Sequence, residues 1–103
     1  MEVVIGVVSK WEDIFVVERK KKDGILKSFP SWEVEINESK ENAVEREVIE
    51  ETWVTAKIVK LLGNRVHPKS KKNLTYYAMD YVSGEISNID KWISKVYLVS
   101  KMN

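Results

Sequence analysis

Cysteine is absent from the 103-residue sequence, which excludes a disulfide framework, a thiolate metal site and a cysteine nucleophile. An excess of charge is missing as well: the formal net charge is +1, so there is no basic footprint of the kind that binds nucleic acid. The longest early apolar run, Val3 to Val8, is far too short to span a membrane and follows no signal-peptide pattern. We therefore expect a cytoplasmic protein whose partners include neither nucleic acid nor membrane.

The composition is that of a small folded domain. Hydrophobic residues make up 44% of the chain and charged residues 32%, a balance that favours a globular protein over a disordered one. The length suits one domain, so residues 1–103 are expected to fold as a single unit.

The first third of the chain predicts a β-hairpin followed by a loop. The runs VVIGVV and DIFVVERK are rich in β-branched residues and predict two strands that turn near Lys10 to Glu12, although Trp11 is an unusual residue in a tight turn. Residues 20–31, KKKDGILKSFPS, are expected to be a loop with a turn at Asp23-Gly24. Residues 32–36, WEVEI, alternate like a short strand.

A helix is predicted next, and then more strands. Ser39 is a suitable N-cap, and the stretch up to Thr52 contains many helix formers and no glycine or proline. Residues 55–68 and 73–85 predict two strands joined by a basic loop, and a last strand follows within residues 95–103. This order of strands, helix and strands predicts an α+β fold with a mixed sheet.

The predicted helix has an acidic face. Glu47, Glu50 and Glu51 stand at i, i+3 and i+4, where like charges repel by roughly a few tenths of a kcal/mol per pair. A divalent cation would offset this repulsion, because Mg²⁺ prefers hard oxygen ligands and binds a few carboxylates together with phosphate oxygens. The alternative is an acidic helix face exposed to solvent.

The acidic helix and the stretch before it resemble the Nudix box, the signature of the Nudix hydrolases. That signature has a glycine, five residues, a glutamate, seven residues and then R-E-U-x-E-E-x-G-U, where U is bulky and apolar. Glu38 is followed after seven residues by Arg46-Glu47-Val48-Ile49-Glu50-Glu51, and Val54 fills the last apolar position. Tryptophans occupy the two glycine positions, Trp32 and Trp53, so the box covers residues 32–54.

The rest of the chain is also similar to this family. The opening hairpin of these enzymes often ends in an arginine, here Arg19, and SFPS resembles the F-P-G-G approach to the box. The resemblance implies a Nudix fold, with a mixed sheet packed against the box helix and a C-terminal helix that is short or absent. It also implies metal-dependent hydrolysis of a nucleoside diphosphate linked to another moiety. The stretch NRVHP favours a MutT-like nucleoside triphosphate pyrophosphatase.

The resemblance assigns metal-binding and catalytic roles to particular residues. Mg²⁺ or Mn²⁺ would be held by Glu47, Glu50 and Glu51 and by the backbone carbonyl of Trp32, with Glu38 supporting the site. Glu50, Glu51, Arg46 and Glu85 are the expected catalytic residues. Glu51 and Glu85 are the candidates for general base, although Glu85 could equally be a turn residue. Arg46 would orient the carboxylates, and its alternative role is an ordinary surface ion pair.

Arg19, Lys69 and Tyr76 are the expected substrate-binding residues. Arg19 and the lysines of the basic loop could meet phosphates or a base edge, although the alternative for the lysines, Lys69, Lys71 and Lys72, is solvated loop charges. Tyr76 and Tyr77 alternate along a strand, so one of them should face the core. The partner would be a nucleotide or a nucleoside-diphosphate-linked small molecule, and the protein itself a monomer or a homodimer.

The tryptophans at the glycine positions suggest two further hypotheses. The first is a catalytically impaired Nudix-like nucleotide-binding or regulatory module, in which a displaced helix end favours domain swapping. The second concerns all four tryptophans, Trp11, Trp32, Trp53 and Trp92, since each stands where glycine would be comfortable. A codon that means glycine in the source organism, such as a reassigned UGA, would produce this pattern if it were read as tryptophan.

Overall fold

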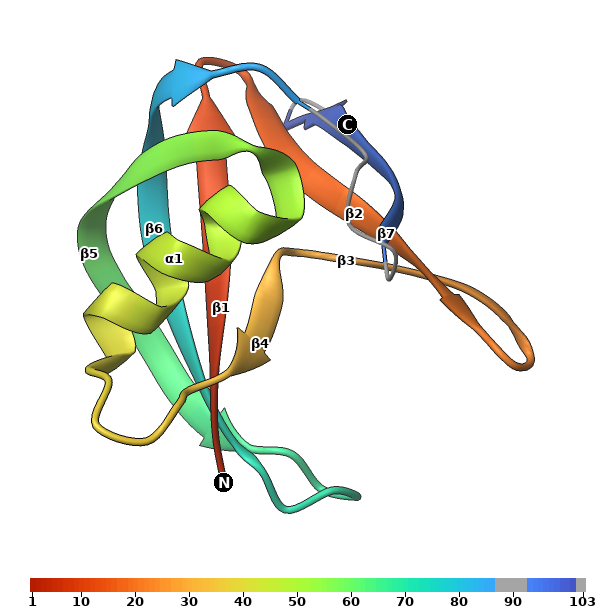
Figure 1. The fold of residues 1–103 in the computed structure, drawn as a ribbon, viewed down its shortest axis with the longest axis vertical. Helices are drawn as coiled ribbons and strands as arrows, with labels where there is room; N and C mark the ends of the chain where they lie inside the picture. The colour runs from red at the N-terminus through yellow and green to blue at the C-terminus, as the bar shows by residue number, and fades with distance from the viewer. Residues whose placement is uncertain (87–92, 102–103) are drawn as a thin grey trace.

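In the computed structural model, which describes residues 1–86 and 93–101, a helix lies across one face of a mixed sheet (Figure 1). Seven strands are hydrogen-bonded in the order β3-β2-β1-β6-β5, with β4 added to β1 and β7 added to β2. The chain order is β1 (Glu2–Lys10), β2 (Asp13–Lys21), β3 (Gly24–Ser28), β4 (Ser31–Glu33), α1 (Lys40–Thr52), β5 (Val54–Val66), β6 (Asn73–Gly84) and β7 (Ile93–Ser100).

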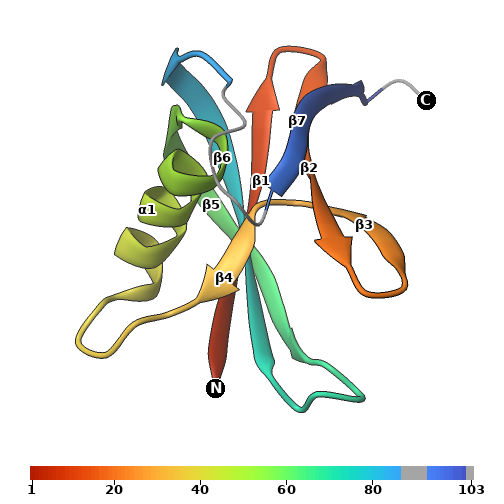
Figure 2. The same cartoon turned by 45° about the vertical axis from the view of Figure 1, so that its right-hand side comes forward.

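Strand β1 is central to the sheet. It forms an antiparallel hairpin with β2 and pairs antiparallel with β4, whereas it runs parallel to β6, with Glu2 opposite Asn73 and Ser9 opposite Asp80. Strands β5 and β6 form a long antiparallel hairpin beyond it. Figure 2 shows β2, β3 and β7 together on the side of the molecule away from α1. The expected α+β fold with a mixed sheet against one helix is confirmed.

Helix α1 begins and ends at the residues that the sequence predicts. The Ser39 side chain accepts a hydrogen bond from the Asn42 amide at 3.1 Å, which caps the first turn. The apolar stripe of the helix is buried against the sheet, with Ala43, Val44 and Val48 at most 1% exposed. The described part of the chain contains no helix long and apolar enough to cross a membrane.

The helix approaches β1 closely at Gly6. A Cβ added there would lie 3.0 Å from both the Met79 sulfur and a Val48 methyl carbon, so glycine permits this contact between helix and sheet. The core around it is made of buried side chains from both layers: Val4, Val8, Phe15, Val17, Val44, Val48, Val54, Tyr77, Met79 and Val96.

Three predicted boundaries are wrong. Residues 20–31 were expected to be a loop, but Lys20 and Lys21 extend β2 and residues 24–28 form β3, which pairs with β2. The predicted strand at residues 32–36 is shorter and earlier, at Ser31–Glu33, and the last strand begins at Ile93. In each case pairing with a neighbouring strand, which local sequence does not encode, decides where the strand lies.

Candidate active site

Arg46 is the centre of the acidic face of α1. Its guanidinium donates two hydrogen bonds to Glu38, Nε to Oε2 at 2.6 Å and Nη2 to Oε1 at 2.9 Å, and Nη1 contacts Glu47 and also Glu50 at 3.0 Å. Glu35 lies 3.8 Å away. The hydrogen bonds from Arg46 lower the pKa of Glu38, and the bond to Glu38 is the main cause of the raised pKa of Arg46. Arg46 therefore links the loop before the helix to the carboxylates on it.

A second arginine, Arg19 at the end of β2, binds the last glutamate of the box. Its Nη2 atom donates to Glu51 Oε2 at 2.6 Å and to the Ser31 carbonyl at 2.9 Å. The Ser31 amide donates to the other Glu51 oxygen at 3.1 Å. Glu51 is 3% exposed, so this cluster joins β2, β4 and α1 around a buried carboxylate.

Glu47 is the other buried carboxylate of the box, with 4% of its surface exposed. Burial raises its pKa to about 7, and the charges of Glu50 and Glu51 act in the same direction, while Arg46 opposes them. In such surroundings a further cation nearby would stabilise the ionised form of the carboxylate. This supports the cation-binding interpretation of the acidic face over the interpretation as a solvated surface.

The donor atoms fit a hard divalent cation, although arginines hold them in this structure. Within residues 1–86 and 93–101, no three acidic or histidine side chains converge as a ready-made ligand set. However, the Ser31 carbonyl oxygen and a Glu51 carboxylate oxygen both accept from one Arg19 nitrogen, so two oxygen donors of the kind that Mg²⁺ prefers converge here. The sequence predicted the Trp32 carbonyl for this place, and the carbonyl found beside Glu51 belongs to Ser31, one residue earlier.

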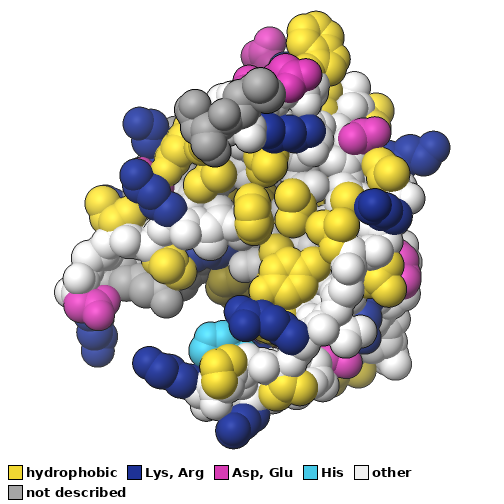
Figure 3. Space-filling view, turned by 180° about the vertical axis from the view of Figure 1, so that it is seen from behind, with side chains coloured by type: hydrophobic (Ala, Val, Ile, Leu, Met, Phe, Trp, Pro, Cys, Tyr) yellow, Lys and Arg dark blue, Asp and Glu magenta, His cyan; other side chains and the backbone are white. Residues whose placement is uncertain are grey.

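A cleft begins beside this cluster. One cavity of about 460 Å³ is lined by Val3, Arg19, Leu26, Ser28, Ser31, Trp32, Glu33 and Lys72. A second, of about 420 Å³, shares Ser28 and Ser31 with the first and is more apolar; it is lined by Ile5, Val16, Lys27, Ser28, Phe29, Ser31 and Tyr76. Ile5 and Tyr76 are opposite each other in β1 and β6 and point away from α1, on the side where Figure 3 shows apolar side chains across the centre of the molecule.

The structure brings some of the predicted substrate-binding residues to this cleft and leaves others outside it. Arg19 and Tyr76 line it, and Tyr77 faces the core at 4% exposure, as the alternation predicted for one of the two tyrosines. Lys69 is exposed in the β5–β6 connection, at the far end of the molecule from the C-terminal half of α1 (Figure 1). Glu85 is exposed just after β6, and within the described part of the chain no hydrogen bond or ion pair joins it to the box.

The sequence did not identify Ser31 as a residue of the site, whereas Lys72 was one of three loop lysines that could meet phosphates. Ser31 contributes both its amide and its carbonyl, and its one signal in the sequence is its place directly before the box. Lys72 reaches the cleft from the β5–β6 connection and pairs with Glu33 at 3.3 Å. Pairing between β1 and β4 and between β1 and β6 brings these distant segments together.

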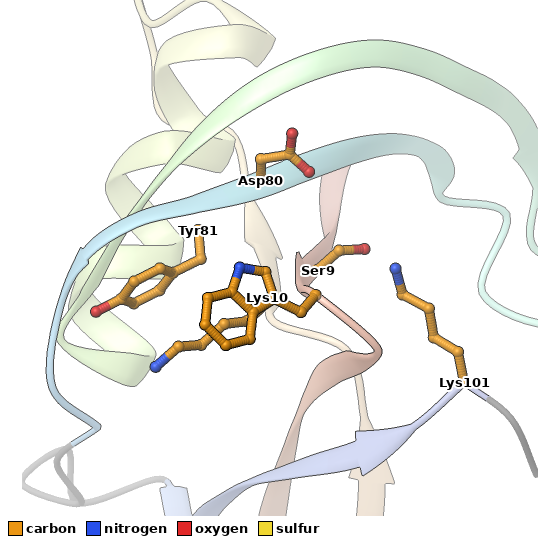
Figure 4. Close-up of a pocket in the computed structure, with 6 residues that line it drawn as sticks. Ser9, Lys10, Asp80, Tyr81 and Lys101 are labelled. Carbon is orange, nitrogen blue, oxygen red and sulfur yellow. The ribbon is translucent and has the colours of Figure 1, made fainter.

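Another cavity, also about 460 Å³, lies at the β1–β2 hairpin and includes no residue of the box. Figure 4 shows its lining, which consists of Ser9, Lys10, Trp11, Asp80, Tyr81 and Lys101. The Lys10 ammonium lies 4.3 Å from the centre of the Tyr81 ring. The cleft beside Ser31 is the candidate active site, because it is lined by Arg19 and Ser31, the two residues that bind the Glu51 carboxylate, and neither of them lines the cavity at the hairpin.

The two tryptophans of the box have different surroundings. Trp53 ends α1 in the left-handed conformation, with φ 65° and ψ 20°, and its amide donates to the Ile49 carbonyl at 2.7 Å. The helix end is therefore not displaced, in contrast to the condition under which domain swapping was expected. Trp32 is 45% exposed in β4, and the Arg19 guanidinium lies 5.6 Å from the centre of its ring.

Comparison with known proteins extends the resemblance over the chain. The family model described as NUDIX domain matches residues 2–100. No curated protein matches the sequence. Similar solved structures include a NUDIX hydrolase from Nitrosomonas europaea, with a TM-score of 0.87 at 16% identity over 98% of this chain and 57% of the other.

Two further structures are similar to the same extent. A UDP-X diphosphatase has a TM-score of 0.81 at 20% identity over 96% of this chain and 50% of its own. An ADP-ribose pyrophosphatase from Streptococcus suis has a TM-score of 0.82 at 16% identity, over 99% of this chain and 75% of its own. The chain thus spans little more than half the length of the first two of these proteins, and at such identities the likeness establishes the fold alone.

Proposed function

Because the chain belongs to the NUDIX domain family, we propose that it hydrolyses a phosphoric anhydride in a nucleoside diphosphate linked to another moiety. The observation that carries this proposal is the position of Glu51. Its buried carboxylate and the Ser31 carbonyl share one cationic nitrogen at the edge of a cleft large enough for a nucleotide.

The cofactor of this proposal is Mg²⁺ or Mn²⁺. Glu47, Glu50, Glu51 and the Ser31 carbonyl would hold it, with Glu38 supporting the site through Arg46. Bound there, the metal would neutralise the charge of a pyrophosphate and orient a water for attack. Arg46 would keep the carboxylates in place, and Glu51 would take a proton from that water. Glu85, exposed after β6, is the other candidate for this role.

The cleft favours a substrate with a nucleobase. Tyr76 and Phe29 give its inner cavity aromatic and apolar walls, and Lys27 adds a positive charge. We propose that a base binds there while the phosphates lie towards Arg19 and Ser31. Our preferred substrate is a nucleoside triphosphate, as in MutT-like enzymes. ADP-ribose and UDP-linked compounds are included as candidates because two of the similar structures are named an ADP-ribose pyrophosphatase and a UDP-X diphosphatase.

One observation favours a second candidate function, an impaired module that binds a nucleotide but hydrolyses it poorly. The Trp32 indole stands where the family pattern has glycine and lines the cavity beside Arg19. A bulky side chain there narrows the space for phosphates.

A hydrolysis assay separates the two functions. The protein would be incubated in Mg²⁺ with nucleoside triphosphates, ADP-ribose and UDP-linked sugars, together with Glu50→Gln, the Trp32→Gly/Trp53→Gly double variant and the matched control Glu45→Gln from the same helix. We expect hydrolysis that Glu50→Gln lowers by at least about tenfold and Glu45→Gln leaves unchanged. Hydrolysis by the glycine variant alone would favour the impaired module, and no hydrolysis by any version would contradict the enzyme.

A further inference from the structure

The position of Arg19 carries a further inference, which rests on the proposed function. One nitrogen, Nη2, is shared by Glu51 Oε2 at 2.6 Å and the Ser31 carbonyl oxygen at 2.9 Å. These are two of the oxygens proposed to hold the metal. A positively charged group of this chain therefore occupies the point at which they converge.

We propose that Arg19 is a resident cation of the site, which neutralises Glu51 until the metal binds and must then release Glu51 and Ser31. Arg19 is a positioning residue in this role. It keeps a buried carboxylate paired, since an unpaired one would be strongly destabilising, and it fixes Ser31 against the helix before any metal is present. The charged guanidinium and a divalent cation repel each other and would contact the same two oxygens, so we expect them to compete for this position.

The surroundings of Arg19 provide a place for the released guanidinium. It lines the same cavity as Lys72 and Trp32, and its central carbon already lies 5.6 Å from the centre of the Trp32 ring, within reach of a cation–π contact. This cavity is the space proposed for the phosphates. The released Arg19 guanidinium would donate hydrogen bonds there, and guanidinium groups often bind phosphate through two parallel hydrogen bonds. Release from Glu51 would thus convert Arg19 from a structural counter-ion into a phosphate-binding residue.

Direct measurement of metal binding tests this without any hydrolysis. Mn²⁺ would be titrated calorimetrically into the wild type, Arg19→Gln, Arg19→Lys and Lys72→Gln at pH 8, with thermal unfolding of each variant as a check of folding. Lys72→Gln is the matched control, since it removes one positive charge from the same cavity but its carboxylate partner is Glu33. We expect Arg19→Gln to bind Mn²⁺ at least about fivefold more tightly than the wild type, because a competing charge is gone. Arg19→Lys should lie between them, and Lys72→Gln should stay within about twofold of the wild type.

The signals of the arginine side chains give a second readout in the unchanged protein. The sequence has three arginines, Arg19, Arg46 and Arg65, so each Nε–H resonance can be assigned by single substitutions. Saturation with Mg²⁺ should shift the Arg19 resonance and leave that of Arg65 in place. This measurement decides the matter even if Arg19→Gln fails to fold.

The outcomes separate the two proposals. If the wild type binds Mn²⁺ but Arg19→Gln binds it no more tightly, or if the Arg19 resonance ignores Mg²⁺, the resident-cation role is overturned while the hydrolase proposal stands. If the folded wild type binds no divalent metal, the metal-dependent function is itself overturned, and the role of Arg19 with it.

Discussion

Two tryptophans have backbone conformations that suit glycine. Trp11 has φ 58° and Trp53 has φ 65°, whereas Trp32 in β4 is not among the described residues with positive φ. Trp11 is the first of two central residues in the β1–β2 turn, and the second, Glu12, has no positive φ, which matches the type II′ turn with its preference for glycine at the first place. These conformations support the hypothesis of glycine codons read as tryptophan; Trp92 lies outside the described residues. The native DNA decides the question, and UGG at these codons would end it.

Replacement of Trp11 by glycine should stabilise the protein. The left-handed conformation costs a residue with a Cβ roughly 1–2 kcal/mol, and Trp11 is 89% exposed, so little burial is lost, whereas Trp53 is 54% exposed and loses more. We expect Trp11→Gly to raise the free energy of unfolding by about 1 kcal/mol in urea titrations, and Trp53→Gly to raise it by less. Trp32→Gly, which relieves no positive φ, is the control and should show no such gain. A loss of stability in both variants would contradict the strain.

The acidic residues of the candidate site could be read from the sequence, but the contacts that join them to other strands could not. Helical geometry alone places Glu47, Glu50 and Glu51 on one face of α1, because it brings i, i+3 and i+4 together. The contact between Arg19 and Glu51 joins β2 to α1 and depends on how strands pair, which no local pattern encodes. For the same reason Ser31 was missed.

At the scale of elements, the end of α1 fits against the end of β6. Val54 pairs with Gly84, and a Cβ added at Gly84 would lie 2.6 Å from the Trp53 carbonyl oxygen. Gly84 also has φ +104°, so both space and conformation require glycine there. The helix and the hairpins were predictable because caps, turns and periodicity are local. Strand β3 was not, since residues 25–27 are exposed and gain their structure from pairing with β2.

Substitution of Gly84 should be more costly than substitution of Gly24. Both have positive φ, but nothing lies within 4 Å of a Cβ added at Gly24. We therefore expect Gly24→Ala to lower the free energy of unfolding by about 1 kcal/mol and Gly84→Ala by about 2–3 kcal/mol, because the second also displaces the helix end. Thermal unfolding followed by circular dichroism would measure the difference. Equal losses would show that the α1–β6 junction adjusts freely.

For the whole molecule, the buried Glu47 links stability to pH. Its pKa is about 7 in the folded protein and near the ordinary 4.5 when unfolded, so the folded state binds the extra proton between these values. The contribution of Glu47 to the free energy of unfolding should therefore be greatest below about pH 4.5 and should fall as the pH rises towards 7.

Urea titrations of the metal-free protein at several pH values from 4.5 to 8 test this linkage. Glu47→Gln, which cannot ionise, should remove the fall over this range. Glu12→Gln is the control, since it removes one negative charge from an exposed side chain in the β1–β2 turn. This variant should keep the fall in stability with rising pH. If the free energy of unfolding of Glu47→Gln still falls with rising pH, groups other than Glu47 cause the pH dependence.

The parallel pairing of β1 with β6 also has a consequence for how the chain folds. Strand β1 is synthesised before β6 and can form its hairpin with β2 at once, but its other edge stays open until Asn73 to Asp80 have been synthesised. Contacts between such distant segments are formed late, because a long loop must close before they contribute. The carboxylates of α1 are synthesised before β5 and β6, so α1 cannot pack against the complete sheet until those two strands are present. The cleft beside Ser31 is thus completed only after β6 has been synthesised, although most of its charged residues precede that strand in the sequence.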